Sequence, residues 1–262
     1  MTSDDISTPP RMRNLEQPYF IPLLVRSNFG QPFCSIIQNS KLGIVRGKYT
    51  TMMPPIPEFK VSTVMPEDLP SIGTLHARAF HRKSDWHRKV FPPSIAPWWS
   101  EKYALDTPDP ATRLLKISSP ESSNTVMGLI SIRKYGANER GAGRWSSFPP
   151  PAEVDREIYD VMVQSMIDYR EKYMLGKDHF CVDHFGVDSE VQGKGMGAAL
   201  LGRACEIADQ EGLDVFVEAN EFAESFYQRF GFRTEGKLLV TGGLTECFLV
   251  RRFAGQKKKV DM

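Results

Sequence analysis

The chain has 262 residues, 41% of them hydrophobic and 25% charged, so it is long and apolar enough for one well-packed domain with additional segments. Its formal net charge of +1 creates no field that would select nucleic acid or an anionic membrane as a partner. No apolar run is long enough to cross a bilayer, the first residues lack the pattern of a secretory signal, and the four cysteines form no Cys-x-x-Cys pair. We therefore expect a cytoplasmic protein with no nucleic-acid or membrane partner, no structural disulfide and no metal site.

Proline content divides the chain near residue 57. Eight prolines within residues 1–57 break any long helix there, so we expect an accessory or disordered N-terminal leader. Regular patterns begin just beyond it and predict one domain over residues 58–254. Residues 255–262 contain three consecutive lysines and form a short basic tail, which we interpret as a solvated terminus.

Hydrophobic spacing predicts the elements in the first part of this domain. Strict alternation indicates strands, and apolar residues three and four apart indicate helices. Residues 81–110 follow neither pattern and are expected to be irregular. In chain order we expect a strand at 59–64, a helix that begins at 66–68, strands at 113–117 and 126–132, a Gly/Pro/Ser-rich loop at 136–151 and a helix at 152–173.

The last third of the chain has the clearest pattern. Gly212 and Gly231 stand where helix C-terminal caps are expected. The predicted elements are a strand at 179–187, a Gly-rich turn, an amphipathic helix at 196–208, a strand at 213–218, a short helix at 222–230 and a strand at 246–253.

The Gly-rich turn between a strand and a helix suits an anion. The first N–H groups of a helix have no intrahelical partner, and glycine allows a phosphate to approach the backbone closely. The spacing Gly193-x-Gly195-x-Gly197 fits neither a P-loop, which needs Gly-Lys-Ser/Thr, nor a Rossmann fingerprint, which needs Gly-x-Gly-x-x-Gly. A tight connection without a ligand is the alternative interpretation.

Two motifs in this region resemble those of the GNAT acetyltransferase superfamily. The first resembles the Gln/Arg-x-x-Gly-x-Gly/Ala signature, and the second resembles the Asn-x2-Ala-x3-Tyr-x3-Gly-Phe element. The match is strong between residues 179 and 232, diffuse between 59 and 135, and absent before 57. The matching stretches are Gln192-Gly193-Lys194-Gly195-Met196-Gly197 and Asn220-x2-Ala223-x3-Tyr227-x3-Gly231-Phe232.

The resemblance implies an α/β (α+β) GNAT fold, with a mixed, mostly antiparallel sheet flanked by helices. Two parallel strands, Cys181–Val187 and Leu213–Ala219, would splay apart to admit acetyl-CoA as the acyl donor. The pantetheine arm would pair with backbone near Val187, and main-chain N–H groups of residues 192–197 would bind the diphosphate. Lys194 would add charge or be merely solvated, and Asn220 would bind the cofactor or cap the next helix.

The reaction that the resemblance implies is direct transfer of an acetyl group to a primary amine, without an enzyme-bound intermediate. Tyr227 occupies the family's tyrosine position and would be the general acid, although aromatic core packing of a short helix is the alternative. Strand alternation puts Cys181, Asp183, Phe185 and Val187 on one face. Members of the family often have a Glu or His on that face, so the resemblance implies Asp183 as the base, and a carboxylate hydrogen-bonded for structure is the alternative. His184 would face away unless a bulge at Gly186 intervened.

The acceptor is not specified by any motif. Trp86, Trp98, Trp99 and Tyr103 would border the acceptor site or simply pack together, and the loop at 136–151 would cover it. The histidines at positions 76, 81 and 87 are interpreted as surface residues. We expect a small-molecule amine acceptor and a monomer or homodimer. The alternatives are acetylation of a protein N-terminus or lysine, and an inactive acyl-CoA-binding module.

Overall fold

The computed structural model describes residues 59–82, 84–119, 125–141, 145, 148–240 and 243–255. The predicted leader at 1–57 and all but the first residue of the predicted basic tail lie outside these residues. No helix in the described part of the chain is long and apolar enough to span a membrane.

A seven-stranded sheet forms the centre of the described domain, with the strand order β1-β2-β3-β4-β5-β7-β6. Every neighbouring pair is antiparallel except β4 and β5, which are parallel. This confirms the predicted mixed, mostly antiparallel sheet. The strands are β1 (Ser62–Thr63), β2 (Thr112–Ser118), β3 (Val126–Tyr135), β4 (His179–Val187), β5 (Asp214–Asn220), β6 (Arg233–Val240) and β7 (Leu244–Arg251).

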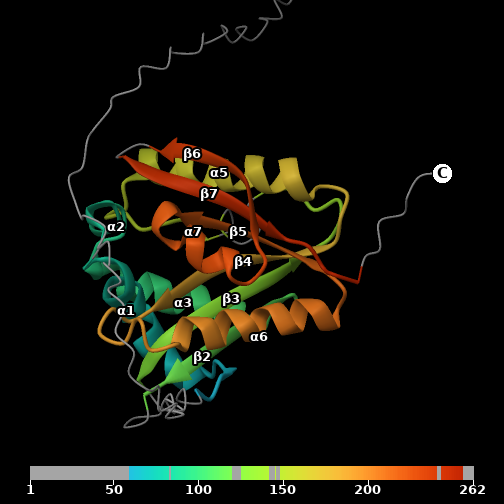
Figure 1. The fold of residues 1–262 in the computed structure, drawn as a ribbon. Coiled ribbons are helices and arrows are strands. Elements are labelled where there is room, and N and C mark those ends of the chain that lie inside the picture. The colour runs from blue at the N-terminus through green and yellow to red at the C-terminus, as the bar shows by residue number, and fades with distance from the viewer. Residues whose placement is uncertain are drawn as a thin grey trace, which may run out of the picture. The chain divides into compact units, whose positions relative to one another are not determined.

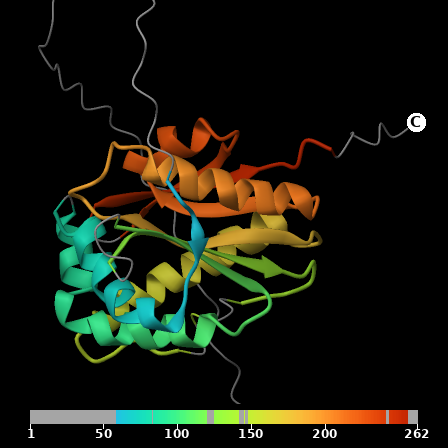
Figure 2. The same cartoon turned by 90° about the horizontal axis from the view of Figure 1, so that it is seen from below.

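Helices cover both faces of the sheet, as Figures 1 and 2 show. Helices α6 and α7 pack on one face, whereas α1, α3 and α5 pack on the other. The helices are α1 (Leu69–Phe80), α2 (Asp85–Val90), α3 (Ala96–Asp106), α5 (Arg156–Met174), α6 (Met196–Gln210) and α7 (Glu221–Gln228), with 3-10 turns η1 (Pro66–Asp68) and η2 (Pro93–Ile95).

The prediction of an irregular segment at 81–110 is wrong, because α2 and α3 occupy much of it. The segment follows neither hydrophobic pattern, and that was the reason for the prediction. Pro93 and Pro97 lie in the first turn of η2 and α3, where the missing N–H needs no helical acceptor. Strand β6 was also missed, since its exposure alternates at the sheet edge and few of its residues are apolar.

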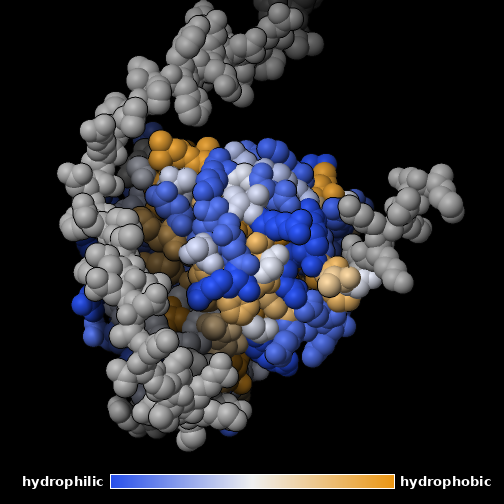
Figure 3. All heavy atoms as spheres, viewed as in Figure 1, coloured by the Kyte–Doolittle hydropathy of each residue, from blue (hydrophilic) through white to orange (hydrophobic). Residues whose placement is uncertain are grey.

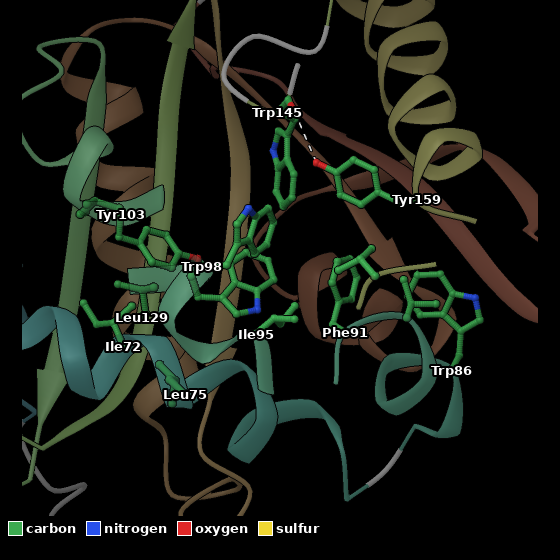
Figure 4. Packing of buried hydrophobic residues seen from close by; sticks show 14 of the residues in the cluster. Ile72, Leu75, Trp86, Phe91, Ile95, Trp98, Tyr103, Leu129, Trp145 and Tyr159 are labelled. Carbon is green, nitrogen blue, oxygen red and sulfur yellow. Dashed lines mark hydrogen bonds between the residues drawn. The ribbon is translucent and has the colours of Figure 1, made fainter. Parts of the chain in front are cut away.

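The apolar core consists of two large clusters, one on each face of the sheet, and a smaller third cluster next to α5 that includes Cys181 and Phe248. Leu129 on β3 lies in the cluster beneath α1 and α3, and Leu200 on α6 lies in the other; both are fully buried. Burial of one such side chain contributes roughly 1.5–3 kcal/mol. Figure 3 shows that hydrophilic residues cover most of the face in view, with smaller apolar areas between them. Figure 4 shows part of the first cluster, in which Trp145 lies next to Tyr159.

Candidate active site

Strands β4 and β5 pair only over their first halves. The parallel register runs from His179–Asp214 to Val182–Val217 and then stops, although β4 continues to Val187 and β5 to Asn220. The two strands therefore diverge, as the resemblance predicted. A cavity of about 600 Å³ opens at the divergence and is lined by residues from both strands and from α1, α5, α6 and α7.

A β-bulge at Asp183 sets the direction of the side chains in β4. Ser131 of β3 pairs with His184 and Ile132 pairs with Val182, so Asp183 has no partner on β3. The extra residue reverses the alternation of the strand. Phe185 therefore packs with Val182 on the α6 face, while His184 lies on the opposite face.

The predicted face assignment for β4 was consequently wrong. Cys181 belongs to the cluster on the α5 side, whereas Phe185 and Val187 pack on the α6 side. His184 does not share a face with Val182. The bulge that causes this lies at Asp183, not at Gly186, where the sequence suggested it.

The Gly-rich loop presents the open N-terminus of α6. Gly193 and Gly195 have φ values of 80° and 95°, in the left-handed region that glycine tolerates best. Gly195 is the N-cap residue and supplies no capping side chain. The N–H of Ala199 donates to the Gly195 carbonyl, so the amides of residues 196–198 lie ahead of the helical hydrogen bonds. These amides and the helix dipole favour a phosphate at this position.

Nine of the ten predicted site residues line the same cavity. Lys194 is the exception: it is exposed and does not contribute to the lining. The residues that do are Asp183, Val187, Gln192, Gly193, Gly195, Met196, Gly197, Asn220 and Tyr227.

Two of these side chains have structural roles in the protein. The Gln192 amide donates to the carbonyls of Val187 at 2.8 Å and Ala79 at 3.3 Å, and so fixes the loop against β4 and α1. The Asn220 side chain accepts a hydrogen bond from the Ala223 N–H at 3.1 Å and caps α7. Their contribution to cofactor binding stays a prediction.

Tyr227 is held at the divergence of the strands by aromatic neighbours. Its ring is 4% exposed and lies 5.4–6.2 Å, centroid to centroid, from the rings of Phe232, Phe226 and Phe185. Burial raises the pKa of its hydroxyl above the ordinary value, so the phenol stays protonated at neutral pH. The side chain thus has the protonation state that a general acid requires.

Asp183 has the properties of a base that works near neutral pH. Burial raises the pKa of its carboxyl to about 6, against the opposing effect of the Lys102 ammonium. The Cys181 thiol donates a hydrogen bond to this carboxyl group. Its Oδ1 atom is buried without a hydrogen-bond partner among the described residues, and that atom is available to accept a proton from an amine.

His184 is a weaker base than Asp183. Its Nδ1 hydrogen-bonds the Tyr103 hydroxyl, and its ring stacks on Trp99 with a centroid distance of 5.1 Å. Burial, followed by the charge of Lys102, lowers the pKa of the imidazole to about 3. The neutral ring therefore serves as a wall of the cavity and presents a buried Nε2 that lacks a partner in the described structure.

Two carboxyl groups at the cavity were not recognised as a pair from the sequence. Glu218 of β5 hydrogen-bonds Glu246 of β7, and burial raises the pKa of Glu218 well above the ordinary value. Glu246 is 5% exposed. The signal was available, because Glu246 directly precedes the apolar run at 247–250, where a carboxyl group is expected to be buried with it.

The interpretation of three histidines as surface residues is wrong for His76. This side chain is 5% exposed, lines the cavity and stacks on Trp99 at 4.7 Å between ring centroids. His81 and His87 are half-buried, and the ring centroid of each lies 5.9 Å from that of His76. Burial lowers the pKa of all three. The described residues contain no group of three or more side chains suited to a metal ion.

Aromatic and sulfur-containing side chains wall the cavity on the α3 and α5 side. Trp99, Trp145, Met162 and Met166 contribute to the lining. Trp145 is 7% exposed, and its carbonyl accepts a hydrogen bond from the Tyr159 hydroxyl at 3.4 Å (Figure 4). Of the four aromatic residues expected to border the acceptor site or to pack together, all four pack in the buried cluster under α1 and α3. Only Trp86 and Trp99 of these also line the cavity.

Comparisons with known proteins agree with this geometry. Residues 164–246 match the family model of the acetyltransferase (GNAT) domain. No curated protein matches the sequence at a significant level.

Solved structures of low sequence identity share the fold. Arylalkylamine N-acetyltransferase 2 from Aedes aegypti is 14% identical, covers 74% of this chain and 99% of its own, and has a TM-score of 0.56. The mosquito arylalkylamine N-acetyltransferase like 5b is 8% identical, covers 74% of this chain and 99% of its own, and has a TM-score of 0.52. Histone acetyltransferase HPA2 and related acetyltransferase from Corynebacterium glutamicum is 19% identical, covers 75% of this chain and 97% of its own, and has a TM-score of 0.50.

Proposed function

The chain belongs to the GNAT acetyltransferases, and on that premise we propose that it moves an acetyl group from acetyl-CoA to the primary amine of a small molecule. The observation that carries the proposal is the single cavity at the divergence of β4 and β5. The Gly-rich loop, Tyr227 and Asp183 all contribute to its lining.

The loop and the diverging strands suit the donor. The diphosphate would be bound by the amides at the N-terminus of α6, where glycine at 193 and 195 leaves the backbone open. Between Asp183 and Val187, strand β4 has β3 on one side and no paired strand on the other. An extended pantetheine arm fits that free edge like an added strand.

The transfer needs three proton movements. Asp183 would accept a proton from the acceptor ammonium, directly or through water, and release the nitrogen lone pair. That nitrogen then forms the new C–N bond as the C–S bond of the thioester breaks, and Tyr227 would donate its proton to the departing sulfur. The second proton of the nitrogen would then pass to the Tyr227 oxygen, directly or through water, and restore the phenol. No bond between acyl group and protein is needed.

The walls of the cavity support a small acceptor. Trp145 packs between Trp99 and Tyr159, with centroid distances of 6.0 Å and 6.4 Å, and covers the side of the cavity next to α5. Two of the structural neighbours named above are arylalkylamine N-acetyltransferases, which is consistent with an aromatic wall. The Corynebacterium neighbour is named as a histone acetyltransferase, so a protein N-terminus or lysine belongs in the same test.

The test is release of free thiol from acetyl-CoA in the presence of a panel of amines and lysine-containing peptides. We expect turnover with at least one small amine and little with peptides. Turnover with peptides alone would favour the protein-acetylating alternative. Binding of acetyl-CoA without any turnover would favour an inactive binding module.

A matched pair of loop variants tests the diphosphate site. A Cβ at Gly193 meets no atom within 4 Å, and asparagine and aspartate tolerate a positive φ better than most residues. Gly193→Asp adds a charge that Gly193→Asn lacks. At an effective dielectric constant near 20, a like charge about 5 Å away costs about 3 kcal/mol. We expect the KM for acetyl-CoA to rise at least tenfold more in the aspartate variant; equal values would place the diphosphate elsewhere.

A further inference from the structure

The cavity lining contains a pair of contacting carboxyl groups, Glu218 and Glu246. In the register of β5 and β7, Glu218 pairs with Phe248 and Asn220 pairs with Glu246, so the two glutamates are diagonal neighbours on adjacent strands. Their side chains hydrogen-bond each other. The Ser165 hydroxyl of α5 donates to Glu246 Oε2 at 3.5 Å, which places the pair on the α5 side of the sheet.

This carboxyl pair has no cationic partner among the described residues. Neither glutamate forms an ion pair with any of them. Two carboxyl groups in contact oppose each other's ionisation, and burial raises the pKa of both. A cation beside the pair would therefore stabilise its ionised form. The nearby Arg170 donates instead to the carbonyls of Glu139 and Gly141, at distances of 2.7–3.3 Å.

The cavity wall also contains buried polar atoms that have no hydrogen-bond partner among the described residues. Trp99 and Trp145 line the cavity and are 2% and 7% exposed, and their indole N–H groups find no acceptor among the described residues. Glu218 Oε2 likewise has no donor there. Such groups are costly to bury unless something satisfies them. Their gathering around one cavity indicates a polar ligand with an apolar body.

We propose that the Glu218–Glu246 pair binds the acceptor's ammonium group and excludes acceptors that carry a carboxylate beside the amine. The acceptor class is then a hydrophobic primary amine, as opposed to an α-amino acid. This inference rests on the proposed function and adds the chemical selectivity of its acceptor site.

The selectivity follows from charge and from the shape of the wall. An ammonium near the pair gains a counter-ion in a water-poor space, whereas a carboxylate one carbon away is repelled by the same charge. The apolar remainder of the acceptor would lie against Trp99, Trp145, Met162 and Met166. Selection therefore combines one attractive and one repulsive element.

The experiment compares each amine with its carboxylated counterpart. Acetylation of 2-phenylethylamine, tyramine and tryptamine is measured beside L-phenylalanine, L-tyrosine and L-tryptophan, and kcat/KM is taken from thiol release. L-Phenylalaninamide serves as a control, because it has the bulk of the amino acid without its negative charge. We expect the best amine to exceed its amino acid by about a hundredfold or more, with the amide close to the amine.

Two variants assign the selectivity to the pair. Glu218→Gln imitates the protonated carboxyl group, since its amide can still donate to Glu246 and Glu246 can still ionise. The double variant Glu218→Gln/Glu246→Gln removes both carboxyl groups at nearly constant volume. We expect the preference for amine over amino acid to persist in the single variant and to fall at least tenfold in the double variant. Circular dichroism and acetyl-CoA binding check that both variants fold.

The outcomes separate this inference from the proposed function. Turnover with a ratio of amine to amino acid near one, or a ratio that the double variant leaves unchanged, would overturn the carboxyl-pair assignment alone. Absence of turnover with every amine would overturn the proposed function, and the acceptor class with it.

Discussion

The pKa of Asp183 gives the proposed mechanism a quantitative consequence. Only the carboxylate form can accept a proton, so activity must rise with pH as Asp183 ionises. With a pKa of about 6, the carboxylate fraction grows from about a tenth at pH 5 to about nine tenths at pH 7. We therefore expect kcat/KM to rise about tenfold over this interval and then to level off.

Replacement of the carboxyl group should remove that dependence. Asp183→Asn keeps the size of the side chain but cannot take the proton, and loss of a general base typically lowers the rate by about 10²–10⁴-fold. The assay is thiol release from acetyl-CoA between pH 5 and 8, with the acceptor amine held below saturation. Asp160→Asn is the control, because the Asp160 side chain is 60% exposed on α5, away from the cavity lining.

Stability provides a second control on the same variant. The folded-state pKa of Asp183, about 6, lies above the ordinary aspartate value of 3.8. The free energy of unfolding therefore falls as the pH rises from about 4 to about 6, and above that range the ionised carboxyl group opposes folding. The asparagine variant is therefore expected to have a Tm at pH 8 no lower than that of the wild type. An asparagine variant that folds normally and retains the rate and the pH profile of the wild type would refute the role of Asp183 as base.

Three further predictions concern other parts of the domain. Tyr227→Phe keeps the aromatic packing of the ring but removes the proton donor, so kcat should fall about 10²–10⁴-fold with little change in Tm, as measured by steady-state kinetics and thermal melting. Leu200→Ala, in the fully buried interface of α6 and the sheet, should cost about 2–5 kcal/mol in urea unfolding, whereas Leu239→Ala at a 70% exposed position should cost little. Asn220→Ala should lower the free energy of unfolding by about 1 kcal/mol, because α7 loses its cap.

The second half of the fold was predictable because its signals are local. Strand β4 begins and ends where alternation predicted, and α6 begins at Met196 directly after the glycines. Gly212 has a φ of 70° and follows α6 at the position expected for a cap. In each case the residues that determine the element lie within or beside it.

The elements that were missed depend on contacts distant in sequence. Helix α3 is stabilised by the burial of Trp98, Trp99 and Tyr103 against α1, β3 and the Trp145 ring, and no local pattern shows this. Strand β6 forms because β7 offers it a hydrogen-bonding edge. Packing against distant residues outweighed weak local propensity in both cases.

The candidate site was predicted in part for the same reason. Motif residues such as Gly193 and Tyr227 could be identified from their spacing, and the structure brings them to one cavity. The partnership of Glu218 and Glu246 depends on the register of two strands that a helix and another strand separate in the chain. The orientation of His184 depends on a one-residue bulge that alternation alone does not reveal.

The bulge at Asp183 lets strand β4 keep its apolar packing while one residue is left out of the alternation. In a regular strand, side chains two positions apart share a face. Val182 and Phe185 are three positions apart, yet the bulge directs both into the same apolar cluster. The Asp183 carboxyl group between them lies outside that cluster and contacts the Cys181 thiol instead. A change of side chain at Asp183 would alter the proposed proton transfer while the apolar anchorage of β4 stays intact.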